Sequence, residues 1–302
     1  MDKNTDNKVY WHLPGFCVFF YLNQVIINNM KLHPELFKDN YAVGAVYGSF
    51  PGAIWNGGRA VLGLTVKSDM EKIIKTYNDF GVPVKFTFTN SLIEEKHLQD
   101  TYCNLIMQVA DNGNNHVLVN RPVLEDYLRA NYPNFKFISS TTKRIKSVEA
   151  IKEELEKDYE LVVLDYDLNK DETVLKELEP YAGRIEILVD EICYPNCPRR
   201  LEHYKDEALK QLTFDRTTPF PCPNRSTPPS FEEAKKRPGF IGNDIIDSYI
   251  ERGYRNFKLV GRGLPMELVL DSYIYYLAKE ECAKELRSIV VNTLAKLNVK
   301  IK

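Results

Sequence analysis

The stretch 161-LVVLDYDLNKDETVLKELEPYAGRIEILVD-190 reads as a strand, a helix and a second strand in succession. Its two outer runs, 161-LVVLD-165 and 185-IEILVD-190, are short and mainly apolar, which is typical of parallel strands covered on both faces. The segment between them, 171-DETVLKELEPYA-182, has the apolar spacing of an amphipathic helix. This stretch therefore predicts a parallel strand–helix–strand unit.

The same unit repeats along most of the 302-residue chain. Seven strand-like runs are clear, and the weaker 238-PGFIG-242, followed by a helix-like segment, supplies the eighth that a closed (β/α)₈ barrel requires. No glycine-rich turn follows any of these runs, so the barrel is favoured over an open doubly wound sheet. The clear runs are 42-AVGAVYG-48, 83-PVKFTFT-89, 116-HVLVN-120, 135-FKFISS-140, 161-LVVLD-165, 185-IEILVD-190 and 257-FKLVGR-262.

We therefore expect a single α/β domain with a TIM-like (β/α)₈ barrel over residues of about 40–280 and extra helices at both ends. The segment 213–239 carries six prolines and no periodicity, so we expect a long inserted loop there. Loops of this length inside compact domains are usually functional or disordered.

The composition excludes several classes of protein. Hydrophobic residues make up 44% and charged residues 27% of the chain, with a net charge of −2, as in soluble globular proteins. This near-neutral balance gives no broad positive field for duplex DNA. No secretory signal opens the sequence, and no apolar run reaches the roughly 20 residues of a membrane span. We therefore expect a cytoplasmic protein without a membrane span.

Polar residues follow most of the predicted strands, at the end of the barrel where the sites of such folds lie. If a polar or anionic substrate binds there, several oriented donors should converge on it. The predicted substrate ligands are Asn56, Arg59, Asn90, Lys143 and Arg262. Each of these could instead serve as a turn former or cap, and Trp55 could anchor its loop rather than bind a ligand. A small molecule, a nucleobase and a peptide are all compatible with this lining.

Three of the six cysteines have the placement of metal ligands. Cys193 and Cys197 follow the predicted sixth strand among prolines and polar residues, and Cys222 lies in the inserted loop, which is long enough to return to them. Three thiolates can hold a [4Fe–4S] cluster with one open iron, or zinc with a fourth ligand such as His203. Cys17, Cys103 and Cys282 lie in apolar segments and are predicted to pack in the core.

The segment 187-ILVDEICYPNCPRRLEHY-204, followed by Cys222 and by 240-FIGNDIIDSYIERGYRNFKLVGR-262, resembles the collagenase-like peptidase family. That barrel superfamily also contains the iron-sulfur proteins of oxygen-independent ubiquinone hydroxylation and relatives acting in RNA hydroxylation. The specific part of the resemblance covers roughly the last 120 residues. Two positions depart from the family pattern: Asp190 replaces an expected Asn, and Gly242 with Asn243 stands where Arg-Pro is expected. The matching residues are Glu191, Cys193, Cys197, Pro198, His203 and Tyr204.

The resemblance implies an iron-sulfur protein more strongly than a protease. On that basis we predict a redox enzyme or enzyme component in oxygen-independent hydroxylation, with Asp190, Glu191 and His203 as catalytic residues and a possible hetero-partner of the same family. Two alternatives stay open. One is a peptidase-like hydrolase, although no Ser-His-Asp, HExxH or Cys-His constellation stands out. The other is a non-catalytic binding protein in which zinc pins the proline-rich loop.

Overall fold

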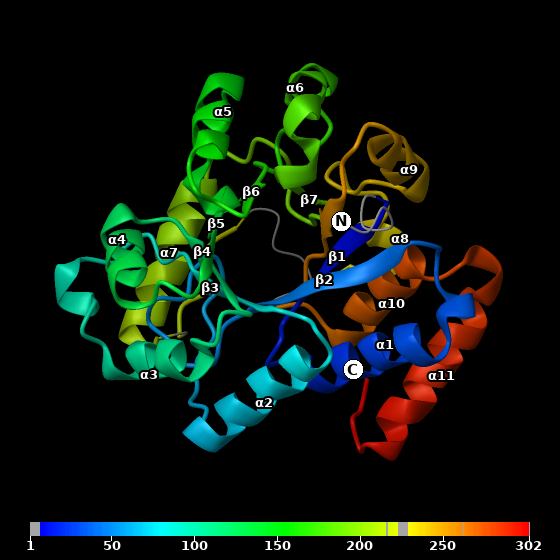
Figure 1. Cartoon of the computed structure of the whole chain (residues 1–302), viewed down its shortest axis with the longest axis horizontal. Coiled ribbons are helices and arrows are strands. Elements are labelled where there is room, and N and C mark those ends of the chain that lie inside the picture. Colours follow the sequence, from blue (N-terminus) through cyan, green and yellow to red (C-terminus); the bar gives the residue numbers. More distant parts are fainter. Residues whose placement is uncertain (1–6, 216, 223–228, 262, 302) are drawn as a thin grey trace.

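The computed structural model describes residues 7–215, 217–222, 229–261 and 263–301. Its strands form one closed parallel barrel in which each strand pairs with the next and β8 pairs with β1 (Figure 1). The (β/α)₈ TIM-like barrel predicted from the sequence is therefore confirmed. The strands are β1 (Val9–Pro14), β2 (Tyr41–Gly48), β3 (Val84–Phe88), β4 (His116–Val119), β5 (Lys136–Ser139), β6 (Leu161–Val163), β7 (Ile185–Leu188) and β8 (Asn256–Lys258).

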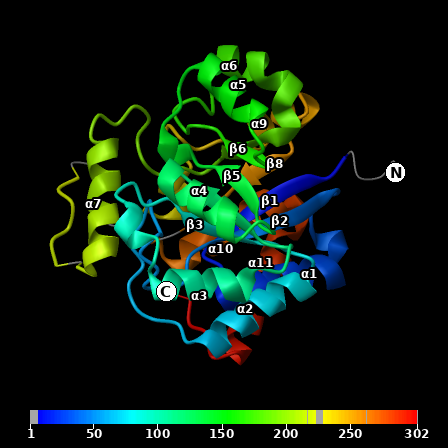
Figure 2. The ribbon, with the colours of Figure 1, turned by 60° about the vertical axis from the view of Figure 1, so that its left-hand side comes forward.

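Helices alternate with these strands and surround the barrel (Figure 2). The last helix, α11, lies beyond the final strand–helix pair and contacts α1 and α10. None of the helices in the described residues is long and apolar enough to cross a membrane. The helices are α1 (Phe20–Leu32), α2 (Lys67–Asp79), α3 (Thr101–Ala110), α4 (Pro122–Asn131), α5 (Val148–Glu156), α6 (Glu172–Leu178), α7 (Arg200–Thr213), α8 (Phe231–Ala234), α9 (Asn243–Glu251), α10 (Met266–Leu277) and α11 (Ala283–Lys296).

The first strand differs from the prediction. The barrel begins at Val9 rather than near residue 40, because β1 pairs in parallel with both β2 and β8. Consequently α1 belongs to the first strand–helix unit and is not an extra helix. The weak run 238–242, which was predicted to complete the eight strands as the seventh in chain order, does not join the barrel. Phe240 makes only an isolated antiparallel bridge to Asp190.

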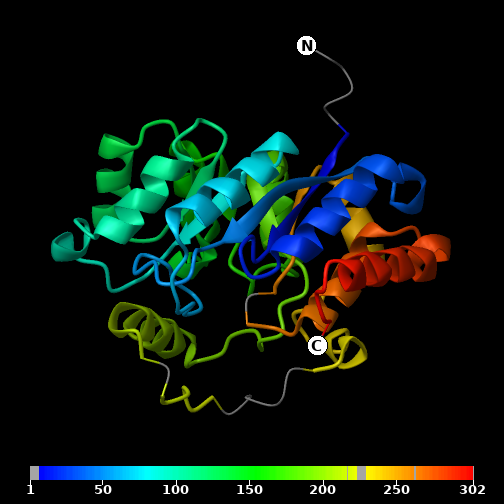
Figure 3. The same cartoon turned by 90° about the horizontal axis from the view of Figure 1, so that it is seen from below.

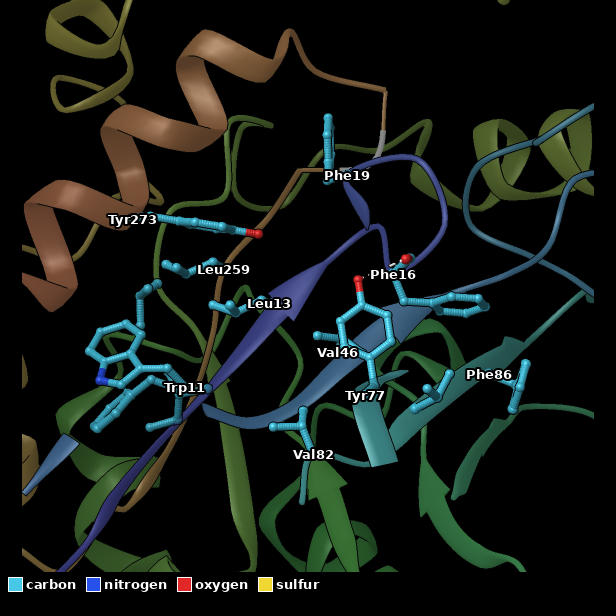
Figure 4. Close-up of a cluster of buried hydrophobic side chains, with 14 of the residues drawn as sticks. Trp11, Leu13, Phe16, Phe19, Val46, Tyr77, Val82, Phe86, Leu259 and Tyr273 are labelled. Carbon is cyan, nitrogen blue, oxygen red and sulfur yellow. Dashed lines mark hydrogen bonds between the residues drawn. The ribbon is translucent and has the colours of Figure 1, made fainter. Parts of the chain in front are cut away.

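The sequence of β1 explains why a search for continuous apolar runs misses it. Trp11 and Leu13 point outward into the core shared with the helices, whereas His12 between them bonds to Asn256 of β8. The strand therefore alternates in polarity, as a strand does when its two faces meet different surroundings. Figure 4 shows Trp11 and Leu13 in the outer core with Leu259 and Tyr273.

The core has two layers that follow from the alternation of side chains along each strand. The outer layer, between strands and helices, contains Phe86, Val117, Phe137 and Ile187. A separate apolar cluster is formed by the residues that alternate with them inside the barrel. Its members are Leu118, Ile138, Leu161, Val163, Tyr166 and Leu188. Because both faces are covered, β4 and β6 read as apolar runs, whereas β3, β7 and β8 also carry the inward charges Lys85, Glu186 and Lys258.

The proline-rich insertion starts where α7 ends, at Thr213, and includes the short helix α8. Figure 3 shows α7, the described part of the insertion and α8 along one edge of the molecule, opposite the start of β1. This is the edge at which the C-terminal ends of the strands open.

Candidate functional site

A polar pocket opens at the C-terminal ends of the strands, the end at which TIM-barrel sites lie. Its cavity volume is about 90 Å³. The walls come from the ends of β2, β3, β4, β7 and β8, from the segments that follow β2, β3, β5, β7 and β8, and from the start of α7. The lining residues are Tyr47, Gly58, Arg59, Thr87, Thr89, Leu118, Ser140, Thr141, Thr142, Leu188, Glu191, Arg200, Tyr204, Lys258 and Val260.

Arg200 is the unusual residue of this lining. It is only 3% exposed, yet its Nε and Nη2 atoms have no hydrogen-bond partner, and no carboxylate of the described residues lies within ion-pair distance. Its guanidinium carbon lies 4.4 Å from the ring centre of Tyr166 and 5.6 Å from that of Tyr204. Burial lowers the pKa of Arg200, but the charges of Glu191, Tyr204, Tyr166 and Cys193 together outweigh this effect and raise it. The pocket thus contains a permanent buried cation with unused donors.

Glu191 is the one carboxylate among the described residues that line the pocket. Its side chain is largely buried, and one oxygen accepts a hydrogen bond of 2.9 Å from the backbone N–H of Cys193. This bond ties the pocket carboxylate to the loop that carries two of the cysteines. Glu191 is therefore held in a defined orientation while it still faces the cavity.

The loop after β2 delivers Arg59 to the pocket. Trp55 is fully buried and its indole N–H donates to the carbonyl of His97 at 2.8 Å, so this residue anchors the loop rather than facing a ligand. Gly57 packs against the backbone after β3, where a Cβ atom would come within 2.3 Å of the Thr89 carbonyl carbon. The side-chain amide of Asn56 donates to the carbonyl of Arg59 at 2.7 Å.

The structure does not gather the predicted substrate ligands into one site. Arg59 lines the pocket, but Asn56 binds its own loop and Gln211, and Asn90 donates to the carbonyls of Ile54 and Ala208. Lys143 bonds to Glu154 at 2.8 Å and to Tyr159 at 2.9 Å, away from the pocket. Arg262 lies outside the described residues. Polar side chains at strand ends here mostly satisfy the backbone and side chains of neighbouring segments.

Of the three predicted catalytic residues, Glu191 lines the pocket. Asp190, the preceding residue, points into the wall, where its carboxylate accepts a bond of 2.6 Å from the Val260 N–H, and burial raises its pKa to about 7. His203 lies one turn beyond Arg200 on α7, stacked on Phe220 with 4.6 Å between ring centres, and it does not line the pocket.

Arg200, Tyr204 and Thr141 are pocket residues to which the sequence analysis assigns no role. Arg200 lies two residues after Pro198 of the cysteine–proline motif, and this position could have identified it as a candidate site residue. Only the orientation of α7 reveals that Arg200 turns inward, whereas the adjacent Arg199 reaches out to the insertion.

The three predicted metal ligands lie around the start of α7. Cys193 and Cys197 are partly buried in the loop between β7 and α7. Arg199 donates to the carbonyl of Pro221 at 2.6 Å, so the residue before Cys222 is held beside that helix start. However, within the described ranges no three His, Cys, Asp or Glu side chains are placed to hold a metal ion. The thiols are not assembled as a ligand set, and the cluster and zinc ligations stay predictions.

Of the other three cysteines, only Cys103 is buried in the core as predicted, and Cys17 and Cys282 are partly buried. Cys103 is buried in α3, and Cys17 and Cys282 lie against the outer core.

Salt bridges brace the cysteine loop from the neighbouring strands. Arg144 pairs with Asp165 at 3.0 Å and also with Asp167, while Lys146 pairs with Asp167 at 2.6 Å. Asp167 in turn accepts a bond of 2.8 Å from the backbone N–H of Asn196, which lies between the two cysteines. The rim of the pocket on this side is therefore fixed.

A buried ionic cluster lies beneath the pocket, inside the barrel. Glu186 pairs with Lys85 at 2.5 Å and with Lys258 at 2.9 Å, and His12 lies 3.5 Å from the same carboxylate. Burial and neighbouring lysine charges lower the pKa of His12 to about 3, and burial lowers that of Lys85 to about 8. Burial alone would raise the pKa of Glu186, but the two lysines hold it well below its usual range.

The chain resembles a curated protein in sequence and a solved structure in fold. No family model matches the chain. An uncharacterized protease of Methanocaldococcus jannaschii is 25% identical over 193 residues, which cover 60% of this chain and 55% of that protein. The chain thus spans about half the length of this relative. The solved structure of the U32 peptidase Mk0906 matches with a TM-score of 0.53 and 14% identity over 88% of this chain and 97% of that chain. The resemblance to the collagenase-like peptidases is confirmed, and the structural likeness shows the shared barrel fold.

Proposed function

We propose that this U32 peptidase-like barrel protein hydrolyses peptide bonds in substrates that enter the pocket at the mouth of the barrel. The observation that carries the proposal is the placement of one oriented carboxylate, Glu191, in a pocket that also presents Arg59 and Arg200. The protease relative and the peptidase structure support this reaction class over the redox chemistry expected from the sequence.

The proposed chemistry uses residues that line the pocket. Glu191 takes a proton from a water molecule as the water oxygen attacks the carbonyl carbon of the substrate. Arg59 stabilises the negative charge that develops on the carbonyl oxygen, because a fixed cation in a partly desolvated site acts strongly on such charge. As the C–N bond breaks, the proton passes from Glu191 to the leaving amine. Water has then been divided between the two products.

The test is cleavage of a defined peptide mixture, followed by mass spectrometry, with the wild-type chain, Glu191→Gln and a control. Removing the proton acceptor is expected to slow cleavage by on the order of 100-fold. Glu285→Gln changes an exposed carboxylate on α11 and should leave the rate unchanged. Absence of any cleaved peptide, or an undiminished rate in Glu191→Gln, contradicts the proposal.

A second proposal comes from the cysteines. A [4Fe–4S] cluster held by Cys193, Cys197 and Cys222 would make the chain a redox protein, and the attachment of Pro221 to the start of α7 favours it. Anaerobic purification with iron, zinc and sulfide analysis tests it, together with serine substitutions at all six cysteines. Zinc without sulfide supports the zinc alternative. Purified protein without either metal contradicts both.

A further inference from the structure

We infer that Arg200 binds a carboxylate group of the substrate, so that the pocket receives a peptide by its C-terminal end. That the ligand is a peptide rests on the proposed function. That it carries a carboxylate rests on the geometry of the guanidinium group and its surroundings.

The free donors of Arg200 lie on one edge of the guanidinium plane. Nε and Nη2 are the two nitrogens without a partner, and their N–H bonds on this edge run parallel. Two parallel N–H donors match the two oxygens of a carboxylate and form a bidentate pair. The guanidinium carbon lies 4.4 Å and 5.6 Å from the ring centres of Tyr166 and Tyr204, and neither contact supplies a hydrogen-bond partner for Nε or Nη2.

The charges around the pocket favour one negative group. Arg59, Arg200 and Lys258 line it against the single carboxylate of Glu191, and Lys258 is already paired with Glu186. Glu186 is shared with Lys85, so the pocket keeps an excess of positive charge that attracts an anionic group.

A second unused donor supports the same assignment. The hydroxyl of Thr141 is buried without a hydrogen-bond partner, and Thr141 lines the pocket with Arg200. Buried polar groups are nearly always hydrogen-bonded. Two groups without partners in one pocket therefore point to a polar ligand that bonds to both of them.

The size of the cavity restricts what can enter. About 90 Å³ is far below the roughly 300–1,000 Å³ of pockets that enclose whole small molecules. The cavity therefore receives a terminal group, and the rest of the substrate extends outward. Because Nε and Nη2 are shielded from solvent, the entering carboxylate must displace part of the lining to reach them.

The experiment compares N-acetyl-trialanine with a free C-terminal carboxylate and the same peptide with a C-terminal amide. Binding is measured by calorimetry and by the NMR signal of the Arg200 Nε–H. The acid should bind on the order of tenfold more tightly than the amide and should shift that signal. Arg200→Gln should lose the preference, Arg200→Lys should recover it only in part, and Arg287→Gln on α11 should retain it.

Equal binding of acid and amide overturns the inference, and this comparison needs no variant. Binding of inorganic phosphate in preference to the acid also overturns it. The outcome for the proposed function is separate. Cleavage at internal bonds without a preference for a free C-terminus supports hydrolysis and contradicts the carboxylate anchor, whereas acid-selective binding without cleavage supports the anchor and contradicts hydrolysis.

Discussion

Buried cations lie at the pocket and beneath it, and they differ in whether an anion of the chain pairs with them. Beneath the pocket, Lys85 and Lys258 share the carboxylate of Glu186, and each nitrogen lies within 2.9 Å of it. At the pocket, Arg200 is equally buried but has two nitrogens without partners. A buried ion that is paired is part of the structure of the fold, because an opposite charge within the chain compensates it. A buried ion left unpaired points to a group that arrives from outside.

The largest effect on stability is expected at the buried ionic cluster beneath the pocket, here called the lower cluster, when its shared carboxylate is removed. Glu186→Gln leaves Lys85 and Lys258 buried without an anion, which should reduce the free energy of unfolding by about 3–5 kcal/mol. Urea denaturation measures this change. Glu160→Gln removes an exposed pair with Lys136 and should cost less than about 1 kcal/mol. Equal losses in the two variants would mean that the lower cluster is not structural.

A matched pair of substitutions separates the two cations directly. Lys85→Met leaves Glu186 with one lysine and should cost about 2–3 kcal/mol, because a buried charge pair is broken. Arg200→Met removes a cation that has no ion-pair partner, so its stability should change by less than about 1 kcal/mol. Thermal and urea unfolding of both variants provide the comparison. If Arg200→Met is the more destabilised, the arginine is a structural group.

The lower cluster should also make the fold sensitive to acid. The pKa values of His12 and His116 are lowered by burial to about 3 in the folded chain, below their ordinary value of 6.5. The unfolded chain therefore binds more protons between pH 6.5 and 3, and stability falls as the pH drops through this window. The free energy of unfolding should fall by up to about 1.4 kcal/mol per pH unit for each histidine.

The histidine contribution is tested by unfolding experiments from pH 7 to pH 4. Replacing His12 with Gln should make the dependence shallower by the share of one histidine. An unchanged slope in that variant would assign the acid sensitivity to other groups.

The smallest effect is expected at the rim brace. Lys146 pairs with Asp167, but its side chain is 43% exposed and Arg144 pairs with the same carboxylate. Lys146→Gln should therefore reduce stability by less than about 1 kcal/mol. A loss comparable to that of Glu186→Gln would show that the rim is as strongly coupled as the lower cluster.

The site was only partly predictable from sequence, and α7 shows why. Its motif predicted functional residues at its start, and Glu191 just before it does line the pocket. The prediction of His203 rested on the family resemblance, and Arg200 was missed because helical spacing does not reveal which side of a helix faces a barrel. The amides of Asn56 and Asn90 have the same limitation, since their partners Gln211 and Ala208 are more than 100 residues away in the chain.

The sequence by itself determined the barrel, because strands covered on both faces are mainly apolar and alternate with amphipathic helices. It also determined that Cys103 packs in the core, since its neighbours are apolar. Tertiary structure alone decided that β1 closes the barrel, because His12 of this strand is compatible with the interior only beside Asn256 and Glu186. It likewise decided that Lys85 is paired and Arg200 is not. Pairing depends on distances between segments that are remote in the chain, and no local pattern of residues records those distances.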